Sequence, residues 1–185
     1  LDACTSESEG ISPIGYIDDV NIYVASSSTE ENCRRIKAIH SKAEEWARKH
    51  ASVFAPNKYE LTHFTRNPAR FNVNQSVTLG NQEIKPGSSC RFLGVYLDQK
   101  LSGRAHVKQM QAKATKSLAA LSSIAGSTWG VGVIGLRQLY KSVIVPRTLY
   151  CCSVWGAGTR SNNRITAALT REVEKIQYRS ARLIS

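Results

Sequence analysis

The sequence predicts an α+β fold, in which short strands and one amphipathic helix occupy about the first 100 residues and helices occupy the rest. Two observations support this division. Before residue 100, β-branched and aromatic runs end at Gly, Pro or Asn, which is typical of hairpins. After residue 100, apolar residues recur every three or four positions, which is typical of amphipathic helices. We therefore expect one region at residues 1–100 and a helical region at 101–185.

The first expected element is a hairpin within residues 14–24, where two apolar runs flank the pair Asp18-Asp19. Two adjacent carboxylates at such a tip are unfavourable unless a positive charge lies beside them. A divalent cation fits that role, because Mg²⁺ prefers oxygen ligands such as carboxylates. By itself the pair is more typical of a solvated turn, since Asp is a favoured turn residue.

An amphipathic helix is expected next, over about residues 29–50. Ser28 and Glu31 stand at the spacing of a capping box, with Ser28 as the N-cap. Behind them one face carries residues at helical spacing. That face comprises Ile36, Ile39, Ala43, Trp46, Ala47 and His50. Pro56-Asn57 then interrupts the chain before a strand expected at residues 59–64.

A second hairpin is expected at residues 77–85 around the turn pair Gly80-Asn81. Pro86-Gly87 separates it from residues 91–97, which have the pattern of one further strand with Gly94 inside it. The pattern therefore predicts two more β elements before the helical region begins.

Three helices are expected after residue 100. The first has one apolar face and ends at Gly126; that face comprises Val107, Met110, Ala114, Leu118, Leu121 and Ala125. The second holds Leu136, Leu139, Tyr140 and Val143, and Pro146 ends or kinks it. The third begins near Arg164 and runs to about Leu183.

The charge is unevenly distributed along the chain. Residues 1–60 hold 7 Lys/Arg and 10 Asp/Glu, whereas residues 61–185 hold 18 Lys/Arg and 4 Asp/Glu. The second part therefore has a net charge of +14, which favours a polyanionic partner such as nucleic acid over a merely solvated basic surface. On the first helix after residue 100, Arg104, Lys108, Lys113 and Lys116 stand apart from the apolar face, where they are placed to contact phosphates.

Several protein classes are excluded by the composition. The 5 cysteines are odd in number and include no C-x-x-C pair, so neither a disulfide framework nor a zinc finger is expected. No stretch approaches the roughly 18 apolar residues that a membrane span needs, so no membrane partner is expected. Trp129 and Trp155, each followed by Gly, could stack on bases, but packing in the core is the expectation we favour.

Three motifs stand in order along the chain. They are Tyr16-Ile17-Asp18-Asp19, Phe54-x-Pro56-x-Lys58-Tyr59-Glu60-Leu61-x-x-Phe64 and Phe92-Leu93-Gly94-Val95-x-Leu97-Asp98. This succession resembles the last three palm motifs of reverse transcriptases from non-LTR (LINE-type) retrotransposons, especially fungal ones. The segments Ser28–Cys33 and Ile176–Arg179 also resemble that group. The resemblance implies a partial polymerase palm at residues 1–100 and a helical thumb at 101–185.

The resemblance also implies roles for individual residues. Asp18 and Asp19 would bind the catalytic Mg²⁺ ions, with Mn²⁺ as a substitute, and Asp18 would be the more important of the two. Lys58 would protonate the leaving pyrophosphate; without the motif, an exposed lysine before a strand is an equal alternative. Phe92, Leu93 and Gly94 would form a primer grip, a hairpin that holds the primer end.

The implied enzyme is an RNA-directed DNA polymerase that uses an RNA template, a DNA primer and deoxynucleoside triphosphates. The resemblance further implies that a third carboxylate and a nucleotide-binding loop lie in an N-terminal part of the same polymerase, so these 185 residues alone are expected to be inactive. A nuclear or cytoplasmic ribonucleoprotein is the expected location. Two alternatives stay open: a degenerate retroelement remnant that only binds nucleic acid, and a relative of group II intron maturases or telomerases.

Overall fold

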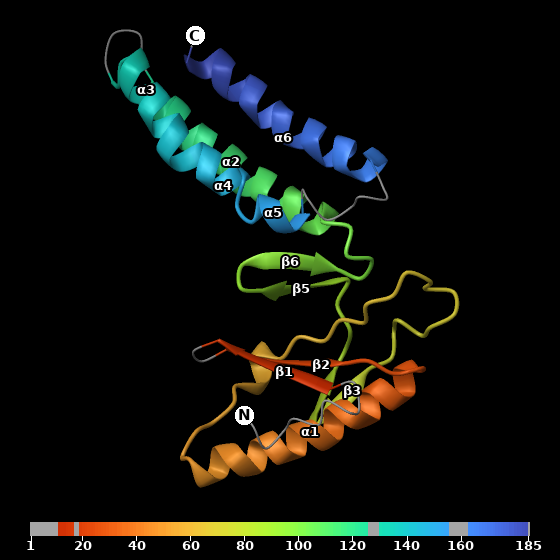
Figure 1. Cartoon of the computed structure of the whole chain (residues 1–185). Helices are drawn as coiled ribbons and strands as arrows, with labels where there is room; N and C mark the ends of the chain where they lie inside the picture. The colour runs from red at the N-terminus through yellow and green to blue at the C-terminus, as the bar shows by residue number, and fades with distance from the viewer. Residues whose placement is uncertain (1–10, 17–18, 126–129, 156–162, 185) are drawn as a thin grey trace. The chain divides into compact units, whose positions relative to one another are not determined.

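The computed structural model describes residues 11–16, 19–125, 130–155 and 163–184 (Figure 1). The chain divides into two compact units, Leu1–Cys90 and Arg91–Ser185. Hairpins and one long helix make up the first unit, and helices dominate the second. The predicted α+β class is therefore confirmed, whereas the division at residue 100 into a palm and a thumb stays a prediction.

Two antiparallel strands, β1 (Ile11–Tyr16) and β2 (Asp19–Val24), form the predicted first hairpin. Their register runs from Ile11 opposite Val24 to Tyr16 opposite Asp19. Residues 17 and 18 lie outside the described residues. In the part of the chain that is described, β1 and β2 pair only with each other, so the hairpin is a two-stranded sheet with both outer edges unpaired.

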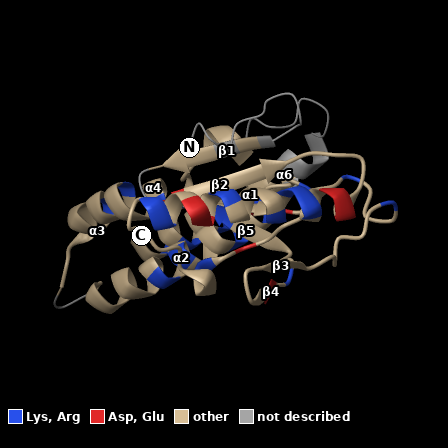
Figure 2. Ribbon diagram, turned by 90° about the horizontal axis from the view of Figure 1, so that it is seen from below, with Lys and Arg blue, Asp and Glu red and all other residues tan. Residues whose placement is uncertain are grey.

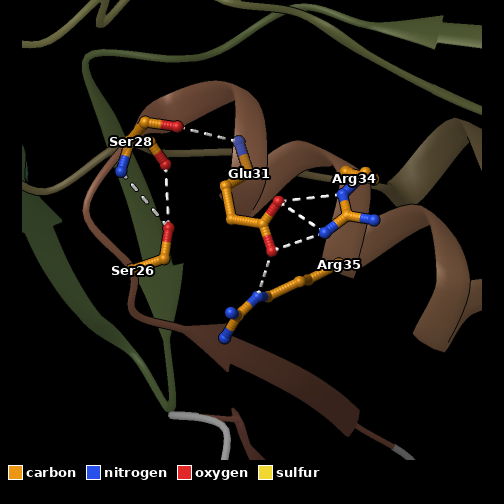
Figure 3. Close-up of polar contacts among 5 residues, drawn as sticks. All are labelled: Ser26, Ser28, Glu31, Arg34 and Arg35. Atoms are coloured by element: carbon orange, nitrogen blue, oxygen red, sulfur yellow. Dashed lines mark hydrogen bonds and ion pairs between the residues drawn. The ribbon is translucent and has the colours of Figure 1, made fainter.

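The helix α1 (Thr29–Lys49) begins where the capping pattern predicts. The Ser28 hydroxyl accepts a hydrogen bond from the Glu31 amide at 3.1 Å (Figure 3). A full capping box would have a second hydrogen bond, from the Ser28 amide to the Glu31 carboxylate, and here both groups have other partners. That amide donates to the Ser26 hydroxyl at 3.4 Å, while the Glu31 carboxylate accepts from the guanidinium groups of Arg35 and Arg34. The predicted capping box is thus only half formed.

The inner face of α1 packs against β2 and β3. Cys33 lies in one apolar cluster with Val77 and Ile84, which face each other across the hairpin of β3 (Val77–Leu79) and β4 (Gln82–Ile84). This hairpin lies within one residue of its predicted place. Trp46 was predicted on the inner face, but it is 43% exposed and stacks on the His50 ring at the end of the helix.

The strand predicted at residues 59–64 is wrong. A short 3-10 turn at Pro56–Lys58 is followed by an extended segment with a single parallel bridge, Leu61 to Pro86. Pro86 has no N–H, so a ladder cannot continue through it. At this bridge the Gly87 amide donates to the Leu61 carbonyl at 2.8 Å.

The single strand predicted at residues 91–97 is also wrong, because it folds back on itself. β5 (Ser89–Phe92) pairs with β6 (Val95–Asp98), and Leu93 and Gly94 form the connection. Their φ angles are 45° and 83°. Two successive positive φ angles are the geometry of a type I′ turn, whose twist matches a tight hairpin. The Gly that was placed inside a strand is therefore a turn residue.

Helices make up the rest of the second unit: α2 (Arg104–Ile124), α3 (Val133–Leu139), α4 (Val145–Thr148), α5 (Cys152–Trp155) and α6 (Asn163–Ile184). Five apolar positions predicted on the inner face of α2 are buried, namely Val107, Met110, Ala114, Leu118 and Leu121. The main core of the unit brings residues of this face together with Leu136, Ile144 and Ile176. Gly126, the predicted end of α2, lies outside the described residues.

The second helix continues through Pro146 to Thr148 rather than ending before the proline. A π-helical segment, Tyr140–Ile144, joins α3 to α4 just before the proline. Proline lacks the N–H of the normal helical bond, and one wider turn accommodates that loss. Ile144, at the end of the π segment, is 1% exposed, so the irregular turn lies against the core. Within the described residues, no helix is long and apolar enough to span a membrane.

Ser28→Ala should lower the free energy of unfolding by about 1 kcal/mol, because the Glu31 amide loses its capping acceptor. Ser41→Ala is the matched control: its hydroxyl bonds the Lys37 carbonyl in the middle of α1, where Ala is the better helix former. Urea unfolding measures both. Equal stabilities of the two variants would contradict the capping role.

Candidate functional site

Asp19 is the described member of the Asp18-Asp19 pair, and Asp18 lies outside the described residues. Asp19 is exposed and begins β2 opposite Tyr16. Because side chains alternate along strands, the register places Asp19 on the same face as Tyr16, Ile14 and Tyr23. These three apolar side chains are 56%, 48% and 53% exposed. Asp19 therefore lies on a face of the hairpin whose apolar side chains are about half exposed.

Lys58 ends the 3-10 turn Pro56–Lys58 and is exposed. The next residue, Tyr59, is fixed to α1: its hydroxyl lies 2.9 Å from Nε2 of His40, which is 7% exposed. His40 Nδ1 lies 3.7 Å from the Glu44 carboxylate. Burial and the Glu44 charge together raise the pKa of the Tyr59 hydroxyl. This contact fixes the backbone beside Lys58 while leaving the lysine side chain exposed.

The predicted primer-grip segment forms the β5–β6 turn. Phe92 is half-buried at the end of β5, and Leu93 is 41% exposed. The Tyr150 hydroxyl donates to the Leu93 carbonyl at 3.0 Å. A Cβ on Gly94 would lie 3.1 Å from the hydroxyl oxygen of Tyr150, so the tyrosine ring covers the glycine closely.

His106 joins this hairpin to the helices. It is 0% exposed; its Nδ1 lies 3.3 Å from the Tyr96 amide of β6 and its Nε2 lies 3.0 Å from the Tyr150 carbonyl. An amide only donates and a carbonyl only accepts, so Nδ1 accepts and Nε2 carries the proton. The Trp155 indole also donates to the Tyr150 carbonyl, at 2.9 Å. Trp155 is half-buried, so it packs only partly into the core that the packing interpretation predicts, and Trp129 lies outside the described residues.

Asp98 closes the connection from β6 to α2. Its carboxylate accepts from the Lys100 amide at 3.1 Å, the Ser102 amide at 2.9 Å and the Ser102 hydroxyl at 3.0 Å. Burial raises the pKa of this carboxyl, but the hydrogen bonds from Ser102, Lys100 and Ala105 outweigh burial and leave the pKa below its ordinary value. The sequence motif included Asp98 without giving it a role. In the structure its carboxylate holds the connection between β6 and α2 through these hydrogen bonds.

The four basic residues predicted on α2 are exposed, and Figure 2 shows lysines and arginines along this helix. At 3.6 residues per turn, Arg104 and Lys108 lie about 40° apart, whereas Lys113 and Lys116 lie about 60° apart on another side. Lys113 Nζ lies 5.7 Å from the centroid of the Tyr96 ring. The basic residues thus form two groups rather than one stripe.

Lys116 borders an open groove of about 340 Å³ between α2 and the π segment. Apolar side chains of Ala120, Leu121 and Val143 are among those that line it. Arg147 borders the same groove and donates to the Ser117 hydroxyl. Residues 91–185 carry 15 Lys/Arg and 3 Asp/Glu, a net charge of +12, so this groove lies in the strongly basic unit.

No group of three potential metal-binding side chains occurs among the described residues. Asp18 is outside that search, so the structure leaves the predicted Asp18-Asp19 metal site untested. Of the predicted site residues, Leu93 and Gly94 lie together, in contact with Tyr150. Asp19 and Lys58 lie on separate elements of the first unit.

Comparison with known proteins gives a consistent result. The chain is 32% identical over 100 residues, 54% of its length, to the Pol polyprotein of a type-1 retrotransposable element R1 of Nasonia vitripennis. It is 22% identical over 170 residues, 92% of its length, to a probable RNA-directed DNA polymerase from transposon X-element of Drosophila melanogaster. Over 165 residues it is 23% identical to the RNA-directed DNA polymerase from mobile element jockey of Drosophila funebris.

The chain is a distant homologue of non-LTR retrotransposon reverse transcriptases. It spans 26%, 18% and 17% of the length of these three relatives. No protein-family model matches the chain, and no solved structure matches it. The relationship therefore rests on these distant sequence similarities.

Asp98→Ala should destabilise the chain by about 1 kcal/mol at neutral pH, because hydrogen bonds to a partly exposed carboxylate are lost. The pKa of the Asp98 carboxyl is lower in the folded chain than the value of 3.8 expected in the unfolded chain. The carboxylate therefore contributes its full stabilisation above pH 3.8, and this contribution is lost as the pH falls through the folded-state pKa. Unfolding measured from neutral pH down to about pH 2.5 should therefore show the difference disappearing in acid. Glu174→Ala, which removes an exposed carboxylate, is the control. A pH-independent difference for Asp98→Ala would contradict this account.

Proposed function

We propose that the chain is a palm-and-thumb part of an RNA-directed DNA polymerase encoded by a non-LTR retrotransposon. The observation that carries the proposal is similarity along 92% of the chain to a protein named as such a polymerase, together with an Asp-Asp pair at the first hairpin. The palm part would end near residue 100, and residues 101–185 would form the thumb. A fungal origin is a finer proposal that rests on Ser28–Cys33 and Ile176–Arg179, since the relatives named above are insect elements.

Asp18 and Asp19 would hold divalent metal in this polymerase. Their carboxylate oxygens suit Mg²⁺, with Mn²⁺ as a substitute. When bound, the metal supplies activation of the primer 3′-hydroxyl and charge stabilisation at the leaving pyrophosphate. The chain's own carboxylates orient that metal from one hairpin, and a further carboxylate would come from the N-terminal part of the same polymerase.

Two features of the first unit support a covering segment outside these residues. The face of β1 and β2 that carries Asp19 exposes Ile14, Tyr16 and Tyr23. The side-chain oxygen Oδ1 of Asn32, near the start of α1, is buried without a hydrogen-bond partner among the described residues. Exposed apolar faces and unsatisfied buried polar atoms both favour a further packing partner. We propose that this partner is the preceding part of the palm.

Lys58 would act as the general acid that protonates the leaving pyrophosphate. Its exposed side chain extends from a backbone that Tyr59 and His40 fix to α1. A fixed backbone with an exposed cationic side chain suits a group that must reach an incoming phosphate. The substrate would be a deoxynucleoside triphosphate.

The second unit would hold the RNA template and the DNA primer. The turn Leu93-Gly94 would contact the primer end, and Arg104, Lys108, Lys113 and Lys116 would contact phosphates of the duplex. A nuclear or cytoplasmic ribonucleoprotein is the location that this activity implies.

A nucleic-acid-binding remnant is the second candidate. The net charge of +12 on residues 91–185 favours it, because phosphate binding needs no carboxylates. Substitution of the Asp pair separates the two proposals: a remnant has no extension activity to lose.

Asp18→Asn in the polymerase that contains this chain should abolish primer extension, because an anionic metal ligand is lost. Asp19→Asn should reduce extension less. Primer extension on an RNA template in saturating Mg²⁺ measures both, and Glu174→Gln, an exposed position on α6, is the charge-matched control. Near-normal kcat in Asp18→Asn would contradict the metal-ligand role.

The second unit should bind a DNA–RNA hybrid through its phosphates, with affinity that falls steeply as salt rises and depends little on sequence. Lys108→Ala should reduce the slope of log Kd against log salt by about one, as should Lys113→Ala. Gln109→Ala, at an exposed and uncharged position on the same helix, is the matched control and should leave the slope unchanged. Affinity that is independent of salt would remove the nucleic-acid role.

A further inference from the structure

The turn Leu93-Gly94 is held by a residue far along the chain. Leu93 has a φ of 45°, a left-handed conformation that is uncommon for a residue with a side chain. Such a conformation persists when surrounding contacts over-determine it. Tyr150, which follows α4, makes such contacts with this turn.

Tyr150 contacts both turn residues. Its hydroxyl donates to the Leu93 carbonyl at 3.0 Å. Its ring covers Gly94 so closely that a Cβ there would lie 3.1 Å from the hydroxyl oxygen and 3.2 Å from Cε1. The φ of 83° favours glycine at position 94, and a Cβ there would also require the tyrosine ring to shift by a few tenths of an ångström.

The backbone of Tyr150 is itself held by hydrogen bonds. Its carbonyl accepts from the buried His106 imidazole and from the Trp155 indole, at 3.0 Å and 2.9 Å. His106 also accepts from the Tyr96 amide of the same hairpin at 3.3 Å. The backbone of Tyr150 is thus fixed to α2 and α5 while its side chain fixes the turn. The tyrosine remains 44% exposed, so it also borders solvent at the turn.

We propose that Tyr150 is a positioning residue: it sets the conformation of the Leu93-Gly94 turn and, through the turn, the place of the primer 3′ end. This inference rests on the proposed polymerase function. The tyrosine touches the turn rather than the reacting atoms, so it acts through Leu93 and Gly94.

The test is Tyr150→Phe in the polymerase that contains this chain, studied by single-turnover extension of a primer on an RNA template. Loss of one hydrogen bond to the turn should lower the rate constant about three- to tenfold. The KM for the nucleotide and the amplitude, which reports the folded active fraction, should stay near normal. Tyr178→Phe removes a hydroxyl from a 72% exposed tyrosine on α6 and is the matched control.

A second measurement does not depend on activity. In the 185-residue chain, Tyr150→Phe should speed amide hydrogen exchange at Gly94 and Val95, and Tyr178→Phe should not. Gly94→Ala should impair extension, and its effect should be smaller in a Tyr150→Ala background, because the ring that the new Cβ would meet is gone.

The outcomes separate the two proposals. If Leu93→Ala and Gly94→Ala both leave primer extension unchanged, the primer-grip assignment in the proposed function fails. If they impair extension but Tyr150→Phe retains the normal rate constant, the positioning role is overturned and the proposed function stands. If Tyr150→Phe lowers only the single-turnover amplitude, the tyrosine contributes to folding alone and the positioning role is overturned. Unchanged hydrogen exchange at Gly94 and Val95 in Tyr150→Phe also overturns the inference.

Discussion

The two hydrogen bonds of the buried His106 ring are the constraint on which the second unit depends. They join the β6 backbone to the connection that follows α4, while His106 itself lies in the first turn of α2. A buried imidazole must have both nitrogens satisfied, which fixes its tautomer and its partners together. The β6 strand, the start of α2 and the backbone of Tyr150 are therefore joined through this one side chain.

The first unit depends on fewer contacts. Its core is a small cluster around Cys33, Val77 and Ile84, and the Ser28 cap fixes where α1 begins. The hairpin that carries Asp19 leaves apolar side chains exposed on one face. Exposed apolar side chains favour a further packing partner, which agrees with the proposal that a preceding part of the same protein completes the palm.

Much of this architecture could be predicted from the sequence, because local patterns determine it. The helix cap at Ser28, the buried face of α2 and the hairpin around Gly80 follow from spacing and turn chemistry. The errors have physical causes: Pro86 interrupts a ladder, and Leu93 enters a turn because a distant tyrosine stabilises it. Sequence spacing carries no signal for a contact across 57 positions, so the roles of Tyr150 and His106 emerged only from the fold. The motifs did identify the polymerase relationship, which the comparisons support, whereas Asp18 lies outside the described residues.

The central claim is that these residues supply the Asp18-Asp19 half of a polymerase centre that another segment completes. Primer extension on an RNA template with Mg²⁺ or Mn²⁺ tests it most directly, using the purified chain with and without the region that precedes it in the polymerase. The account predicts no extension by the chain alone and extension when the preceding region is added. Robust extension by the 185 residues alone would contradict it.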